Sequence, residues 1–171
     1  KLSYLLGKKS NELERIDILN SLGEKYPIKV YGDSHWKNIA KNQLSYMGYA
    51  EHYTQMPQIF RASSINLNII RSYVDSGLPM RIFDVLASHS FLVSNYREEI
   101  DELFSPGKDL IIYRDKKDLL EICAYYLSHE EERQIILNQG FETIKNKHCY
   151  QNRLKNIFHI VKKEFSLARL S

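Results

Sequence analysis

Short apolar runs alternate with amphipathic stretches along most of the chain. The runs have strand length and fall at residues 2–6, 28–31, 46–50, 65–69, 91–93 and 110–113. Apolar side chains recur with helical spacing at residues 12–25, 56–63, 82–86, 97–103, 117–127, 130–147 and 152–165. Strands that alternate with helices favour a parallel sheet with crossover helices. The pattern predicts an α/β fold, a doubly wound, Rossmann-like parallel sheet of about six strands with helices on both faces.

The stretch at residues 63–96 has the order strand, loop, helix, strand. Ile65, Leu67 and Ile69 alternate with asparagines, as in a strand with two different faces. The run at residues 91–93 is wholly apolar, as in a strand buried on both faces. Between them, residues 76–79 (Ser-Gly-Leu-Pro) predict a helix start, with a small capping residue and a proline in the first turn.

Two loops are expected to face a ligand. In doubly wound sheets, ligands bind beyond the carboxyl ends of the strands, near the point where strand order reverses. That rule selects the loop after the first predicted strand, Gly7-Lys8-Lys9, and the loop at residues 71–77 after the fourth. The helix after the first loop is predicted to begin at Ser10 or Asn11. Its expected apolar stripe is Leu13, Ile16, Leu19 and Leu22.

The helix start near Gly77 has the chemistry of an anion site. Its first amides have no partner within the helix, and the helix dipole favours negative charge there. Asp84 lies about one turn further on, where a carboxylate can meet a ribose hydroxyl. Together they predict a nucleotide site. The alternative is that Gly77 and Pro79 only shape the helix start and that Asp84 is a solvated surface acid.

The run LNIIR at residues 67–71, with SGLPMRIFDVLASHSFLVSNY at residues 76–96, resembles a known enzyme family. The family is that of the CgeB-like, spore-maturation type glycosyltransferases, relatives of the group 1 GT-B enzymes, and the likeness is to their C-terminal half. The matching residues are Leu67, Asn68, Arg71, Gly77, Pro79, Arg81, Phe83, Ala87, Phe91 and Leu92. The likeness runs from Gly7 to residues 150–157. It implies the C-terminal half of a GT-B fold.

The resemblance also implies roles for individual residues. In such enzymes the acid of this helix holds the ribose of a nucleotide sugar, here Asp84, and the helix start receives the diphosphate. Together with the loop after the first predicted strand, which contributes Gly7 and Lys8, the expected donor-binding residues are Gly7, Lys8, Gly32, Trp36, Gly48, Tyr49, Asn68, Ser76, Gly77, Leu78, Pro79, Met80, Arg81 and Asp84. Gly48 and Tyr49 correspond to the segment that meets the nucleobase. Arg81 is the expected stabiliser of the leaving group, and no catalytic base is assigned.

Several of these residues have simpler readings, and the chain departs from the family pattern at three positions. Lys8 is either a phosphate contact or solvated, and Trp36 either lines the ligand mouth or packs under its loop. Arg81 either meets a phosphate or pairs with Asp84 within the helix. The family usually has Glu at Asp84, Gly at His89 and, in the broader group, a second acid at Ser76.

Length and composition limit the number of domains and the classes of protein that the chain can represent. The 171 residues suffice for one domain, residues 1–171, and not for a two-domain enzyme. A net charge of +3 does not indicate a nucleic-acid binder. Cys123 and Cys149 show no metal-ligand spacing, and no histidine pairs with such ligands, so no metal is expected. With only two cysteines, the chain is expected in a reducing, cytoplasmic compartment. The basic residues at 145–163, interleaved with aromatics, predict a solvated face or a peripheral membrane contact.

These observations lead to a functional expectation with one alternative. The chain is expected to be the donor-binding half of a glycosyltransferase that moves a sugar from a UDP- or GDP-sugar to an acceptor. No tightly bound cofactor is expected. Because the chain begins inside a predicted strand, we expect it to be part of a longer protein whose N-terminal domain binds the acceptor. The alternative is a non-catalytic nucleotide-binding or interaction module. A signalling receiver is disfavoured, since Gly7-Lys8-Lys9 stands where its acidic pair is needed.

Overall fold

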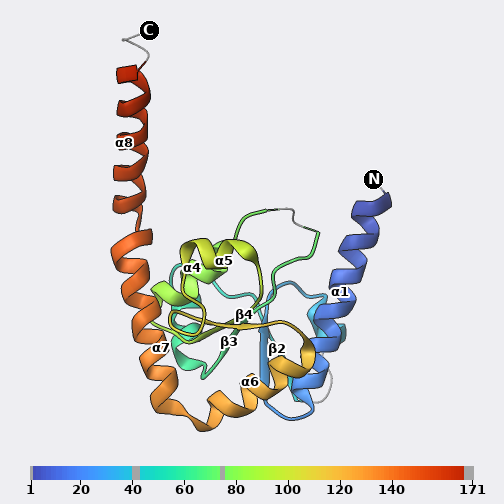
Figure 1. Cartoon of the computed structure of the whole chain (residues 1–171). Helices are drawn as coiled ribbons and strands as arrows, with labels where there is room; N and C mark the ends of the chain where they lie inside the picture. The colour runs from blue at the N-terminus through green and yellow to red at the C-terminus, as the bar shows by residue number, and fades with distance from the viewer. Residues whose placement is uncertain (1, 40–42, 74–75, 168–171) are drawn as a thin grey trace.

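The structure is a computed structural model that describes residues 2–39, 43–73 and 76–167. It consists of short parallel strands surrounded by helices, with α1 and α8 extending from opposite sides (Figure 1). The strands are β1 (Ile28–Tyr31), β2 (Leu44–Gly48), β3 (Asn66–Asn68), β4 (Leu92–Asn95) and β5 (Ile111–Tyr113). The helices are α1 (Leu2–Gly23), α2 (Trp36–Ile39), α3 (Met56–Ala62), α4 (Met80–Ala87), α5 (Glu98–Leu103), α6 (Lys116–Ser128), α7 (Glu130–Thr143) and α8 (Tyr150–Leu167), with a π-helical turn, η1 (Ile144–His148), before α8. None of the described helices is long and apolar enough to cross a bilayer.

The strands form two parallel sheets rather than one. β1 pairs with β2, and β3, β4 and β5 pair in that order. The α/β class and the parallel pairing are confirmed, but the prediction of one sheet of about six strands is wrong for the described residues. Five of the six predicted strands are present, each within two residues of the expected bounds at both ends. The predicted strand at residues 2–6 is not one of them.

Residues 2–6 belong to the long helix α1, which runs on through Gly7 to Gly23. A short apolar run does not by itself distinguish a strand from a helix. No proline interrupts residues 2–23, and one glycine is tolerated inside a helix. Gly7, Lys8 and Lys9 therefore form helical turns and not the predicted loop.

The buried face of α1 agrees with the predicted stripe at Leu22 but differs from it elsewhere. Asn11, Ile18 and Leu22 are buried, whereas Leu13 is 55% exposed. The predicted residues were three apart throughout, and each such step falls about 60° short of a full turn. A stripe with that spacing winds around the helix instead of staying on one face, so mixed spacings of three and four set the packed side.

Two apolar clusters cover the two faces of the three-stranded sheet. Successive residues of β4 point in opposite directions, with Leu92 in one cluster and Val93 in the other. The Leu92 cluster includes residues of α3, α4 and α5, and the Val93 cluster includes residues of α1, α6 and α7. Helices on both faces, as predicted, are therefore confirmed for this sheet.

Helix α7 packs very closely on the segment that leads into β5. A side-chain carbon at Gly140 would overlap the Asp109 carbonyl oxygen and lie 2.9 Å from Leu86 Cδ2. The Asp109 side chain, 3% exposed, accepts hydrogen bonds from Thr143 Oγ1 (2.9 Å) and from the Ser105 backbone N–H (2.8 Å). Gly140 is thus required by close packing rather than by backbone conformation.

Gly140→Ala is expected to destabilise the fold by about 1–3 kcal/mol, the usual cost of overpacking. Helix propensity alone predicts the opposite sign, a gain of about 1 kcal/mol. Urea denaturation followed by circular dichroism measures the difference. Gln139→Ala, on the exposed side of the same helix, is the control and should change stability little. A Gly140→Ala variant as stable as the wild type would contradict the described α7 packing.

His89 occupies the turn between α4 and β4 with φ of 56°, in the left-handed region. This conformation costs most residues about 1–2 kcal/mol but costs glycine almost nothing. It explains the glycine that the resembling family has at this position. The His89 ring compensates by contacting α7. Its Nε2 lies 2.6 Å from Asn138 Oδ1 and its centroid 4.8 Å from that of Phe141.

Both His89→Ala and His89→Gly lose the α7 contacts, but only the glycine variant also loses the backbone strain. We expect His89→Gly to be more stable than His89→Ala by about 1 kcal/mol. Thermal and urea unfolding of the two variants side by side test this. Equal stabilities would mean that this turn carries no left-handed residue in solution.

Candidate functional site

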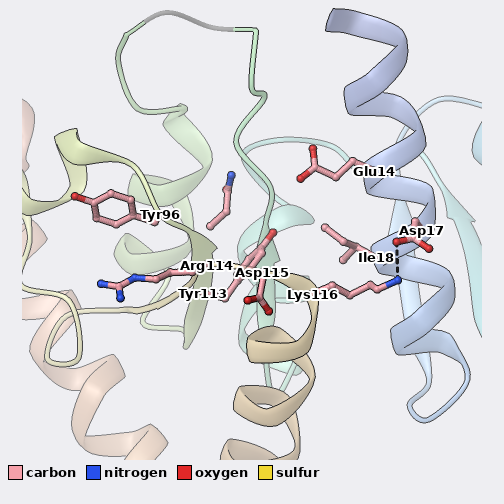
Figure 2. A pocket seen from close by; sticks show the side chains of 9 residues that line it. Glu14, Asp17, Ile18, Tyr96, Tyr113, Arg114, Asp115 and Lys116 are labelled. Atoms are coloured by element: carbon pink, nitrogen blue, oxygen red, sulfur yellow. Dashed lines mark hydrogen bonds and ion pairs between the residues drawn. The ribbon is translucent and has the colours of Figure 1, made fainter.

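A cavity of about 460 Å³ lies where the carboxyl ends of β4 and β5 approach α1. Figure 2 shows Glu14, Asp17 and Ile18 of α1 facing Tyr113 and Lys116 across it. The lining residues are Glu14, Asp17, Ile18, Asn95, Tyr96, Tyr113, Arg114, Asp115 and Lys116. The cavity therefore lies at the sheet edge where ligands bind in parallel α/β folds.

Most charged groups of the cavity are already engaged. Lys116 Nζ lies 2.8 Å from Asp17 Oδ2. The Asp115 carboxylate accepts the Asp118 backbone N–H and so caps α6. The Glu14 carboxylate has no hydrogen bond or ion pair within the described residues.

Tyr113, the last residue of β5, is 3% exposed, and its hydroxyl has no hydrogen-bond partner in the described part of the chain. Burial, followed by the charge of Glu14, raises the pKa of this phenol well above its usual range. The hydroxyl thus keeps its proton at all ordinary pH values and can donate it in a hydrogen bond.

Arg15 connects α1 with the loops that follow β1 and β3. Its guanidinium lies 5.6 Å from the centroid of the Trp36 ring, a cation–π contact. Burial lowers the pKa of Arg15 below its usual value, and the positive charge of Arg71 is the next cause. Trp36 begins α2 just after β1, and Arg71 follows β3. The carboxyl ends of both sheets therefore converge on the inner face of α1.

The anion site at the start of α4 stays a prediction, and the Gly77 amide, which precedes this helix, is already engaged. Gly77 adopts φ of 92°, and its N–H donates to Glu99 Oε1 of α5 at 2.8 Å. The backbone N–H groups of Glu99 itself and of Gly77 lower the pKa of the Glu99 carboxyl. Pro79 is the N-cap, and α4 begins at Met80, so the proline precedes the first turn that the sequence predicted for it.

Arg81 and Asp84 do not pair with each other. The Arg81 guanidinium contacts α3, with Nη1 3.8 Å from Met56 Sδ and Cζ 5.5 Å from the Phe60 ring centroid. The half-buried Asp84 carboxylate has no hydrogen bond or ion pair within the described residues. The intrahelical pair considered from the sequence is therefore not formed. Neither charge is neutralised by the other.

The predicted residues after β1 and β2 are brought together. The Gly32 N–H donates to the Gly48 carbonyl (2.9 Å), and the Tyr46 hydroxyl donates to the Gly32 carbonyl (3.1 Å). Trp36 packs beside Gly32, 3.5 Å from where a side-chain carbon would begin. Tyr49 is 80% exposed. These residues form one rim of the carboxyl edge.

The other predicted residues are more scattered. Asn68 is 6% exposed, and its amide donates to Ser94 Oγ (2.9 Å), so it ties β3 to β4. Ser76 and Met80 are exposed beside the α4 start, and Leu78 packs against the Leu92 cluster. The loop at residues 71–77 includes positions 74 and 75, which lie outside the described residues. Gly7 and Lys8 lie on α1, with Gly7 close to Tyr73.

Sequence reasoning missed Arg15, Tyr113 and the charged turn at residues 114–116. Tyr113 ends a correctly predicted strand and the charged turn follows it, so the carboxyl-end rule already contained the signal. Arg15 is four residues from Asn11 and three from Ile18, both of which are buried. The predicted apolar stripe did not include this face of α1, so its polar residues were not considered as site residues.

The family comparison and the structure comparison both match glycosyltransferases. Residues 14–159 match the model of a family described as glycosyl transferase-like. Among solved structures, the chain is similar to a glycosyltransferase crystal structure from Rickettsia africae ESF-5, with a TM-score of 0.68 and 14% sequence identity. That similarity, which at this identity concerns the fold, covers 88% of this chain and 43% of the other, so the chain spans less than half of that relative's length. A search of curated proteins found no match.

The Gly77 contact predicts a coupled titration. Because the pKa of Glu99 is lowered, its bond to the Gly77 N–H is complete above the ordinary glutamate range and is lost as pH falls through the folded-state pKa. The Gly77 amide resonance should therefore titrate in an NMR series with an apparent pKa below that of an ordinary glutamate. Glu99→Gln should abolish this transition and Glu98→Gln should leave it in place. A Gly77 resonance insensitive to Glu99 would contradict the contact.

Proposed function

The chain belongs to the glycosyl transferase-like family, and from this premise we propose that it is the donor-binding domain of a glycosyltransferase. In this proposal it binds a UDP- or GDP-sugar at the carboxyl edge of its sheets, without a bound metal. The sugar is transferred to an acceptor held elsewhere in the longer protein. The fold shared with a solved glycosyltransferase supports the proposal.

The observation that carries the proposal is the unpartnered Asp84 carboxylate on α4. A partly exposed carboxylate that makes no hydrogen bond or ion pair within the described residues can accept hydrogen bonds from a ligand. The vicinal hydroxyls of a ribose are suitable donors, and Asp84 lies about one turn from the helix start. The Met80 and Arg81 amides at the start of that turn lack an intrahelical acceptor and favour an anion. The Ile82 N–H already donates to the Pro79 carbonyl (3.1 Å). Ribose and diphosphate thus find complementary groups on one short helix.

The proposed chemistry places negative charge on the nucleotide. The bond between the anomeric carbon and the diphosphate oxygen breaks, and the leaving nucleoside diphosphate keeps the electron pair. Helix amides and a guanidinium placed at that oxygen stabilise the developing charge. Arg81 is available for this role, because its contacts with Met56 and Phe60 leave its charge without a carboxylate partner.

We further propose that the acceptor domain and the catalytic base belong to the remainder of a longer protein. The solved glycosyltransferase has more than twice the length that this chain matches. Transfer requires donor and acceptor to be held at near-attack distance, which is worth about 7–11 kcal/mol of the barrier. A single domain that holds only the donor does not supply that positioning.

A second candidate function is nucleotide binding without transfer. It is favoured by Ser76, an exposed hydroxyl residue where the broader family pattern has an acid. It is also favoured by Asp84, whose side chain is one methylene shorter than the usual Glu. Both functions require nucleotide binding at α4, so binding is the first property to measure.

Asp84→Asn is expected to weaken binding of UDP or GDP tenfold or more, because charge-assisted hydrogen bonds to a carboxylate are worth about 1.5–3 kcal/mol. Isothermal titration calorimetry with each nucleotide, with and without EDTA, measures the affinity. Stability should change little, since Asp84 has no partner in the described structure. Glu131→Gln, an exposed acid in the first turn of α7, removes the same charge as a control.

Three results would count against the proposal. Failure of the wild type to bind either nucleotide would remove the donor-binding role. Equal affinities for Asp84→Asn and Glu131→Gln would make Asp84 a surface acid. Loss of binding on addition of EDTA would show that a metal is needed.

A further inference from the structure

Three buried hydrogen-bond donors lie without acceptors where α1 crosses the carboxyl edge. They are Asn11 Nδ2, Arg15 Nε and the Tyr113 hydroxyl, none of which has a partner in the described part of the chain. Asn11 and Tyr113 are each only 3% exposed. Buried polar groups are nearly always hydrogen-bonded, so unpaired ones need an explanation. All three of these groups can offer a proton to the same kind of partner, an acceptor.

The three donors belong to one patch. Asn11 and Arg15 are four residues apart on α1 and therefore share a face. Arg15 and Tyr113 each influence the pKa of the other. The fourth unpaired group, Asn20 Oδ1, is an acceptor. Asn20 lies nine residues after Asn11, which places it on the opposite side of the helix. It is not part of the patch.

The patch also carries unneutralised positive charge. Arg15 contacts the Trp36 ring, and the charge that acts on it most strongly is the like charge of Arg71. Arg71 contacts the Tyr73 ring at 5.9 Å. Neither guanidinium has an ion pair with a carboxylate in the described residues. The attraction of Asp33 for Arg15 is smaller than the repulsion from Arg71. Two adjacent cations whose repulsion is only partly offset by Asp33 raise the free energy of the empty site.

An oxyanion suits the three donors and the two arginines, although the Glu14 carboxylate, which also acts on Tyr113, opposes it there. It accepts hydrogen bonds from the amide, guanidinium and phenol, and it neutralises the two arginines. The planar guanidinium matches the oxygen geometry of phosphate better than any other side chain does. A cation is repelled here, and a neutral sugar leaves the two charges uncompensated. Tyr113 also lines the 460 Å³ cavity, which offers room for the remainder of a phosphorylated ligand.

We propose that Asn11, Arg15, Arg71 and Tyr113 bind the diphosphate of the sugar nucleotide, an inference that rests on the proposed function. The site adds to the α4 start a second source of positive charge, on the opposite face of the sheet, where α1 packs. The loop after β3 links the two, since Arg71 lies near α1 and Gly77 bonds to α5. A diphosphate at the carboxyl edge is thus held from both sides.

The test uses inorganic pyrophosphate as the probe, at constant ionic strength set with NaCl. Calorimetry and thermal unfolding are run on the wild type, Arg15→Met, Arg71→Met and Tyr113→Phe. Arg61→Met is the control, since Arg61 is an exposed arginine at the end of α3 and its loss changes the net charge equally. Methionine keeps the aliphatic stem that packs beside Trp36.

Pyrophosphate should bind the wild type and raise its midpoint of unfolding. Arg15→Met and Arg71→Met should weaken that binding tenfold or more, and Tyr113→Phe about threefold. Arg61→Met should change it less than twofold. Without ligand, Arg15→Met should unfold at the same or a higher temperature than the wild type, because it removes a partly buried, unpaired charge. Arg71 is exposed, so its variant provides a readout even if Arg15→Met does not fold.

The outcomes separate this inference from the proposed function. It is overturned if pyrophosphate has no effect beyond that of NaCl, or if Arg61→Met loses as much affinity as Arg15→Met. If UDP or GDP binding depends on Asp84 but not on Arg15 or Arg71, the donor-binding role stands and the diphosphate site is wrong. If pyrophosphate binds through Arg15 while neither nucleotide binds more tightly than pyrophosphate, the oxyanion site stands and the nucleotide proposal fails.

Discussion

Burial of β4 on both faces is the constraint on which the rest of the structure depends. Leu92, Val93 and Ser94 are 1%, 0% and 0% exposed. Alternate side chains enter two separate apolar clusters, so helices must cover both sides of the strand. A sheet covered in this way offers a ligand only its strand ends. The same packing leaves no space for a side chain at Gly140, where α7 closes over the segment before β5.

Helix α1 combines packing with a polar surface that its packing does not satisfy. Ile18 and Leu22 join the Val93 cluster, while Asn11 and Arg15 occupy the same face one to two turns earlier. The apolar end fixes the helix against the sheet. The polar end then lies over the carboxyl edge, where its donors find no acceptor in the described chain. Such groups lower stability, so each needs an explanation, and a bound ligand is one.

At the start of α4, a group that could bind an anion is already bound to a carboxylate of the protein. The left-handed Gly77 places its N–H against the Glu99 carboxylate, which holds the loop after β3 close to α5. An anion that uses this amide must displace that carboxylate. Further along α4, Asp84 and Arg81 carry opposite charges yet contact different neighbours, because Arg81 turns toward α3. The charges on this helix are therefore available to groups outside the helix.

The sequence by itself determined the α/β class, the strands at residues 28–31 and 110–113 within a residue, and the helix that carries Asp84. These elements can be predicted from local periodicity, because a regular backbone that buries one face repeats its apolar residues at a fixed spacing. It also located the carboxyl edge, since the loops after strands are known once the strands are. It did not determine the state of residues 2–6, because a short apolar run suits either a strand or a helix. Only the tertiary structure decided that α1 packs through Asn11, Ile18 and Leu22 rather than through Leu13. Only it brought Arg15 to Arg71 and Tyr113, residues about 60 and 100 positions apart, because contacts between distant segments depend on how helices close over the sheet and leave no periodic trace in the chain.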